Sequence, residues 1–305
     1  MKKRSIHFPI LKPAFVFLFS LLVFKANAQV YFGASSGYGF GMAKQMIASD
    51  ITGGASGFYL QGGLFGSFGK GFRQSVFGGY QFSEHLSYEI GFEYLSGSKL
   101  RFSMVDTFES NRTLTIERIA GARMTNIVPA LRITIGEKKI KTYIRTGLLI
   151  GVKGWMLSES INTTEDSWGS NINSSKDECI EEYRGGIAWG FAGGFGMNYS
   201  LSKWLSFFTE AVIHAQTWSP LKSSITKYTY NGVDALVSMP VSSKEFEYKE
   251  TVTTNNLQAA SNLNEPTISL KRYYPFSSYG ISFGIILKFP RVKDAPAVPS
   301  TNEQL

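Results

Sequence analysis

The sequence predicts an all-β protein, namely an eight-stranded antiparallel transmembrane β-barrel with short periplasmic turns and long extracellular loops. Eight segments alternate aromatic or branched residues with small or polar ones, which is the period-two pattern of strands. Short and long connections alternate strictly between these segments, as they do in membrane barrels. After residue 28, no uninterrupted apolar stretch is long enough to form a spanning helix.

The first 28 residues have the pattern of a cleaved signal peptide. A basic start at residues 2–4 is followed by an apolar run over residues 14–24, and Ala26-Asn27-Ala28 has the small-x-small form of a cleavage site. The apolar run is shorter than the roughly 18 residues of a spanning helix, which disfavours the alternative of an uncleaved anchor. We therefore expect the protein to be exported.

The formal net charge of +8 lies mostly in this first segment. The segment holds five of the 31 Lys and Arg residues and none of the 23 Asp and Glu residues, so 26 basic residues face 23 acidic ones in the rest, a net charge of +3. No basic footprint for nucleic acid remains. The single cysteine, Cys179, cannot form an internal disulfide and is expected to be a free loop thiol.

The stretch YQFSEHLSYEIGFEY, residues 80–94, shows the alternation clearly. Its aromatic and branched residues, such as Ile90 and Phe92, belong to one face, whereas Glu89 and Glu93 belong to the other. The same two chemistries recur in all eight predicted strands. These strands cover residues 30–40, 74–83, 86–96, 123–136, 140–153, 187–199, 204–218 and 279–289.

The connections between the strands differ in length in a regular way. Short ones fall at 83–85, 137–139 and 200–203, and long polar ones fall at 42–73, 97–122, 154–184 and 219–277. All tight turns should therefore lie at one end of the sheet and all long loops at the other. Pro129 lies within a predicted strand, where it cannot donate a ladder hydrogen bond and indicates a local bulge.

The bulky face should point outward, toward lipid. The interior of an eight-stranded barrel is only just wide enough for side chains, so it suits Gly, Ala and Ser better than rings. A soluble secreted barrel with its apolar face inside is the alternative that this argument disfavours. In that opposite register, Arg132 and Arg145 would enter hydrocarbon at a cost of about 2–4 kcal/mol each near the midplane.

The same register predicts a cluster of charges in the lumen. Most of its members lie four to seven residues from the nearest tight turn, which puts them at a similar height. Because buried charges are costly unless paired, we expect the cluster to be mutually satisfied and to plug the barrel. The alternative is that some of these groups meet lumenal water. The predicted cluster consists of Glu89, Glu93, Arg132, Arg145 and Glu210, with Lys141 and Lys288 nearer the periplasmic mouth.

We expect neither a catalytic nor a metal nor a cofactor site. After residue 28 only two histidines remain, His85 in a tight turn and His214 on an inward face four residues after Glu210, where the two could form a hydrogen bond. No nucleophile is identifiable beside His214, and two histidines with one cysteine give no metal-ligand spacing. GSFGKGF, residues 66–72, lacks the spacing of a phosphate-binding loop.

Three tryptophans are predicted to be interfacial anchors. Trp155 and Trp218 stand where strands meet long loops, and Trp204 follows a tight turn, as expected of the two aromatic girdles of a membrane barrel. Any binding specificity should lie in the long loops, above all in 219–277, for an extracellular ligand that the sequence does not identify.

Three stretches carry a family resemblance, namely GGYQFSEHLSYEIGFEYLSG, IVPALRITIGEKKIKTYIRTGLLIGV and GISFGIILKF. Through them the chain resembles the small outer membrane β-barrel family that is related to the transmembrane domain of OmpA and is common in Bacteroidota. The resemblance covers residues 29–289. It implies residence in the outer membrane, contact with membrane lipid and lipopolysaccharide, and assembly by the outer membrane insertion machinery, for which the last strand, ending at Phe289, serves as a signal. Residues 290–305 are expected to be a short disordered periplasmic tail.

The leading functional hypothesis is a non-enzymatic, monomeric outer membrane barrel that contributes to envelope integrity or to surface interaction through its loops. A narrow passive channel for small or hydrophobic solutes is the first alternative. A lipid-modifying or proteolytic barrel enzyme is the second.

Overall fold

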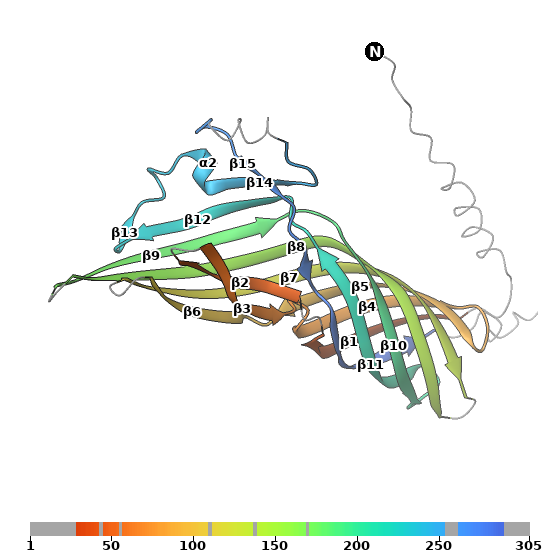
Figure 1. Ribbon diagram of the computed structural model, residues 1–305. Coiled ribbons are helices and arrows are strands. Elements are labelled where there is room, and N and C mark those ends of the chain that lie inside the picture. The colour runs from red at the N-terminus through yellow and green to blue at the C-terminus, as the bar shows by residue number, and fades with distance from the viewer. Residues whose placement is uncertain are drawn as a thin grey trace, which may run out of the picture.

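The described part of the chain is almost entirely β-structure (Figure 1). The computed structural model describes residues 29–42, 45–54, 57–108, 112–136, 139–168, 171–253 and 262–289, so the predicted signal peptide (1–28) and the predicted tail (290–305) lie outside the described residues. The described residues contain one helix, α2 (Val241–Lys244), and no helix long and apolar enough to cross a bilayer. The all-β prediction is confirmed.

Eight long strands pair in a closed ring. Each pairs antiparallel with its two neighbours, and the last strand returns to the first. We call these the ring strands. They lie in the order β1 (Gln29–Gly41), β4 (Gly71–Gln81), β5 (Leu86–Gly97), β7 (Arg112–Ile135), β8 (Ile140–Trp168), β10 (Ala188–Ser200), β11 (Leu205–Trp218) and β17 (Ser278–Lys288).

The tight turns 82–85 and 201–204 and the turn between β7 and β8 lie at one end of the ring, which we call the turn end. The opposite end, the loop end, carries more structure than predicted. The pairing of β7 with β8 continues from Ile135↔Thr142 to Arg112↔Asp166, far beyond the ring, so the predicted loops 97–122 and 154–184 are wrong as loops. Their Thr- and Ile-rich alternation suits a pleated sheet as well as the ring segments do.

Most of the remaining strands continue from this extension and reach away from the ring (Figure 1), whereas β16 pairs with β11. Together with the ring strands they form one fifteen-stranded sheet. A separate two-stranded sheet lies in the predicted loop 42–73. The two-stranded sheet is β2 (Gln45–Gly54) with β3 (Gly57–Gly66), and the added strands are β6 (Leu100–Phe108), β9 (Asn171–Arg184), β12 (Lys222–Tyr230), β13 (Val233–Asp234), β14 (Glu245–Lys249), β15 (Thr267–Leu270) and β16 (Tyr274–Pro275).

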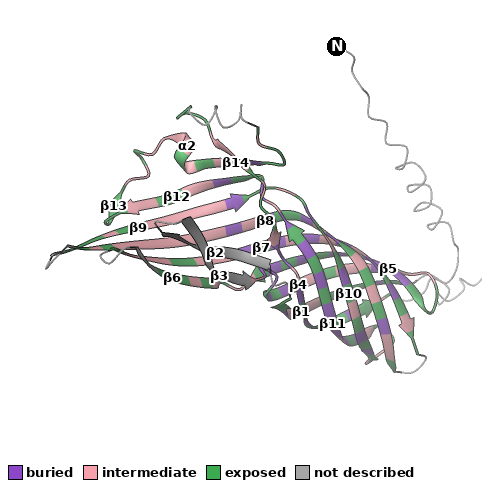
Figure 2. Ribbon diagram, viewed as in Figure 1, coloured by how far each residue is buried: buried purple, intermediate pink, exposed green. Residues whose placement is uncertain are grey.

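Burial alternates residue by residue along the ring strands, as the green and purple bands of Figure 2 show. On β5, Ile90 and Phe92 are exposed and Glu89 and Glu93 are buried. The bulky residues thus occupy the outer face of the ring, in the predicted register. The outer face of the ring is therefore largely apolar, whereas the glutamates lie inside.

The ladder between β7 and β8 contains one irregularity near Pro129. Register shifts between Thr125 and Asn126, and no pairing joins Val128 or Pro129 to β8. Pro129 still lies opposite Ile90 on the other neighbour, β5. Proline has no N–H to donate to a ladder, and the gap in the pairing between β7 and β8 includes this residue.

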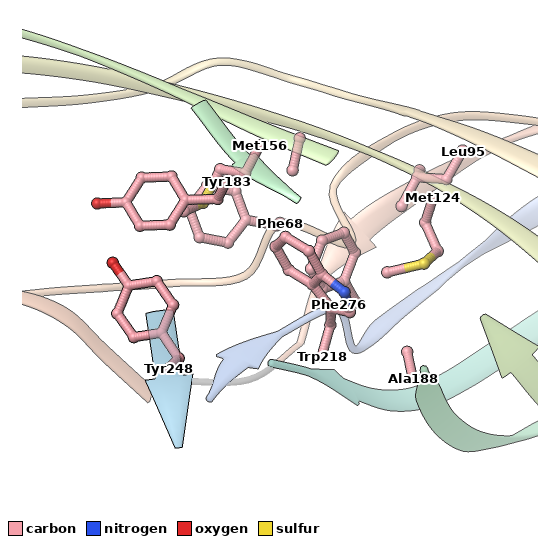
Figure 3. Close-up of a cluster of buried hydrophobic side chains, with 10 residues drawn as sticks. Phe68, Leu95, Met124, Met156, Tyr183, Ala188, Trp218, Tyr248 and Phe276 are labelled. Atoms are coloured by element: carbon pink, nitrogen blue, oxygen red, sulfur yellow. The ribbon is translucent and has the colours of Figure 1, made fainter. Parts of the chain in front are cut away.

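An aromatic cluster closes the loop end of the ring (Figure 3). Phe68 and Phe276 enter it from connections between strands and pack with ring centroids 5.9 Å apart. Trp218 packs edge-on against Phe276 and donates its Nε1–H to the Gly185 carbonyl over 2.9 Å. We call this cluster the apolar cap. Its buried members are Phe68, Leu95, Ala122, Met124, Met156, Tyr183, Ala188, Trp218, Tyr248 and Phe276.

The prediction that Trp218 anchors an outer aromatic girdle is wrong, because this side chain is fully buried in the apolar cap. Trp218 shares its parity on β11 with Glu210 and His214, which also point inward. The period-two rule that placed Glu210 inside applies to Trp218 as well. The position of Trp218 near a long loop suggested a membrane interface, but its position along the strand places the side chain on the inner face of the ring.

Candidate functional site

The interior of the ring contains all five residues of the predicted charge cluster. Glu89 and Glu93 come from β5, Arg132 from β7, Arg145 from β8 and Glu210 from β11, and every one lies on the inward parity of its strand. The structure does not gather them into one group. Instead it divides them among three ion pairs stacked between the apolar cap and the turn end.

The first pair, Arg145 with Glu210, is bidentate. Nε and Nη2 of Arg145 donate to the two carboxylate oxygens of Glu210, each over 2.9 Å. Strand β10 separates β8 from β11, so the pair reaches across an intervening strand. A Cβ at Gly194 of β10 would overlap the Glu210 carboxylate in its present position, so a larger residue there would require Glu210 to move. Parallel N–H···O bonds of this kind are the strong form of a charged hydrogen bond.

The second pair, Arg132 with Glu89, lies nearest the turn end. Arg132 Nη1 donates to Glu89 Oε1 over 3.1 Å, and the Tyr31 hydroxyl donates to the same oxygen over 2.8 Å. The guanidinium lies over the ring of Tyr143, 3.5 Å from its centroid. The charge of Arg132 is therefore shared between a carboxylate and an aromatic face.

The third pair, which sequence reasoning missed, joins Glu93 to Arg73. Arg73 Nη1 donates to Glu93 Oε1 over 2.5 Å, and its Nη2 donates to the Ser278 hydroxyl over 3.1 Å. The predicted strand began at residue 74, which left Arg73 in a loop. Extending the same period-two pattern by one step toward Gly71 would have placed Arg73 inside the ring with Glu93.

Glu93 has further partners. The side-chain amide of Asn126 donates to its Oε1 over 3.1 Å, and His214 Nε2 lies 3.2 Å from its Oε2. The hydrogen bond considered between His214 and Glu210 is therefore wrong, because His214 contacts the glutamate one layer nearer the cap. Gln216 then donates to Asn126 Oδ1 over 2.8 Å, which continues the network up to the apolar cap.

This arrangement neutralises charge and fills space. Three carboxylates meet three guanidiniums, and Glu93 also contacts Asn126 and His214 besides its partner Arg73. Among the hydrogen bonds of the described residues, none links His214 to a serine or cysteine that could act as a nucleophile. No group of three His, Cys, Asp or Glu side chains in the described ranges is arranged to hold a metal ion.

The other singled-out residues lie outside the ring interior. Trp204 is exposed in a tight turn, and Trp155 is half-buried with the Arg123 guanidinium 5.1 Å from its ring centroid. Phe289 is exposed and packs edge-on against Phe32, 5.8 Å between centroids. Cys179 lies on β9 and not in a loop, and burial raises the pKa of its free thiol.

No protein-family model and no curated protein match this chain. Among solved structures, Neisserial surface protein A (NspA) aligns with 86% of this chain and 99% of its own at 12% identity, with a TM-score of 0.29. A Pseudomonas aeruginosa FadL homologue aligns with 87% of this chain and 90% of its own at 8% identity, with a TM-score of 0.17. TM-scores this low support no argument about fold or function.

Breaking the bidentate pair should be costly. Arg145→Ala leaves Glu210 buried without a counter-charge, so we expect the free energy of unfolding to fall by about 3–5 kcal/mol. The double change Arg145→Leu with Glu210→Leu should recover most of that loss, because an apolar pair of similar volume needs no partner. Urea unfolding of the detergent-solubilised protein, followed by circular dichroism, measures both.

The matched control is an exposed pair. Lys222 and Glu247 form an ion pair with side chains 70% and 35% exposed, so Lys222→Ala should cost less than about 1 kcal/mol. Equal losses for Arg145→Ala and Lys222→Ala would contradict a desolvated interior pair.

Proposed function

We propose that this protein is a non-enzymatic outer membrane β-barrel whose eight ring strands cross the bilayer. The observation that carries the proposal is a band of exposed large apolar side chains around the whole ring. Soluble monomers rarely expose apolar patches beyond a few hundred Å². Two members from each ring strand illustrate the band: Val30 and Phe32, Phe72 and Val76, Ile90 and Phe92, Leu131 and Ile133, Ile144 and Leu148, Phe191 and Phe195, Phe207 and Ile213, and Ile281 and Phe283.

The main chain supports the same proposal. Lipid offers no hydrogen bonds, so a spanning sheet has to leave no free edge, and a closed ring of paired strands meets this requirement. The ring strands range from 11 to 29 residues, and a tilted strand needs about 9–11 residues to cross the hydrocarbon core. The tight turns would then face the periplasm and the extended sheet would face the outside.

The closed interior favours a role outside the lumen. Ion pairs and the apolar cap fill the ring, so we propose that the monomeric protein contributes to envelope integrity or to surface interaction through the extended sheet of β9, β12 and β14. The proposal includes export by residues 1–28 and insertion directed by the last strand and Phe289. It also includes contact with lipopolysaccharide and kinship with the OmpA-related barrels of Bacteroidota.

Cell fractionation tests the location. We expect the protein in the outer membrane fraction, extractable only with detergent, and we expect its electrophoretic mobility to shift on heating because a closed barrel stays folded in cold detergent. Recovery of most of the protein in the soluble periplasmic fraction would contradict the proposal.

A narrow channel is the second candidate, and one observation favours it. A cavity of about 380 Å³ opens at the turn end of the ring and reaches inward to Arg132. We nevertheless expect no large steady conductance from the purified protein in planar bilayers, because the ion pairs and the apolar cap lie beyond this cavity. Steady openings of the native chain would favour the channel and reject a closed interior.

A further inference from the structure

The cavity at the turn end, which we call the vestibule, carries an excess of positive charge. Arg132 forms its inner wall, and Lys141 of β8 and Lys288 of β17 line it nearer the opening. Both lysines are half-buried, and no ion pair among the described residues includes either of them. The three interior carboxylates are already paired with three guanidiniums, so none of them neutralises the charge of the two lysines. Glu84, a lining residue in the turn 82–85, is exposed at the rim.

The inner wall offers a fixed donor without an acceptor. Arg132 is 3% exposed, with Nη1 held by Glu89 and its plane held over Tyr143, but its Nη2 is buried and has no hydrogen-bond partner. Buried donors in proteins normally have partners, and the exceptions point to an unfilled role. Asn198, which lies opposite Lys141 in the ladder, also lines the vestibule and presents a buried, unpartnered Oδ1 acceptor.

These groups together fit one kind of ligand. A rigid guanidinium N–H and two ammonium groups around one opening suit the oxygens of a multiply charged oxyanion. The acceptor of Asn198 suits a hydroxyl carried by the same molecule. The volume of about 380 Å³ falls within the range of small-molecule sites, roughly 300–1,000 Å³, and exceeds what a bare ion needs.

We propose that the vestibule binds a small phosphate monoester, with Arg132, Lys141 and Lys288 holding the phosphoryl group and Asn198 accepting a hydrogen bond from the organic part. This site goes beyond the proposed function and does not depend on it, because the vestibule is defined by the ring alone. In the orientation proposed above, its ligand would enter from the periplasm.

Equilibrium dialysis of the full-length, detergent-solubilised protein against radiolabelled inorganic phosphate at low ionic strength tests the site. We expect saturable binding with one site per chain, displaced by glycerol 3-phosphate and not by glycerol. The Lys141→Ala/Lys288→Ala double variant should bind about tenfold more weakly or worse, since it loses two charge-assisted contacts. Low ionic strength is needed because dissolved ions would screen the attraction between phosphate and the partly exposed lysines.

The control removes the same charge elsewhere. Lys99, which follows β5, and Lys153 of β8 are exposed and do not line the vestibule. The Lys99→Ala/Lys153→Ala double variant should therefore leave phosphate binding unchanged. Equal binding by the two double variants overturns the proposal, as does phosphate binding by the native chain that does not saturate or that glycerol 3-phosphate fails to displace. The displacement test needs no variant, so it decides the matter even if the lysine variant does not fold.

Discussion

Six ionised side chains share the inside of one ring of strands, and they have to neutralise one another there because an unpaired buried charge is costly. This requirement links the ring strands to each other. A slip of one residue on β5 would turn Glu89 and Glu93 outward and leave Arg132 and Arg73 without partners. The apolar outer face would be lost in the same step. Charge pairing inside and apolar exposure outside are therefore two results of a single register.

The pairs also decide where a ligand can reach the molecule. Arg145 and Glu210 meet across β10, and Glu93 draws partners from β4, β7 and β11, so the middle of the ring is cross-linked from several sides. Buried pairs of this kind add little net stability compared with apolar packing, but they are expensive to break. Their contribution is to specify one arrangement and to close the interior. Access is left to the two ends, namely the extended sheet beyond the apolar cap and the vestibule at the turn end.

Much of this could be predicted from the sequence because a strand has a strict period of two. That rule located the ring strands, their inward carboxylates and their exposed rings from local pattern alone. It failed where another cue was preferred to it. Trp218 was placed by its nearness to a loop, and Arg73 was left out because the predicted strand began at residue 74, three residues after the start of β4 at Gly71. The partner of His214 could not be predicted in this way, since the stagger between β11 and β5 across the ring is set by closure and not by either strand. The extension of β7 and β8 was missed because charged residues such as Arg118 and Glu159 interrupt the apolar side of its alternation.

The central claim is that the outer face of the ring meets hydrocarbon. Spin labels at Phe283→Cys and Ser282→Cys, each in a chain carrying Cys179→Ser and reconstituted in lipid vesicles, compare adjacent outward and inward positions of β17. The account predicts that oxygen dissolved in the bilayer strongly raises the spin relaxation rate of the label at 283, whereas a water-soluble nickel complex raises it only weakly. The relaxation rate of the label at 282 should respond little to the bilayer oxygen. Strong relaxation by the nickel complex at 283, or the same oxygen response at both positions, would contradict it.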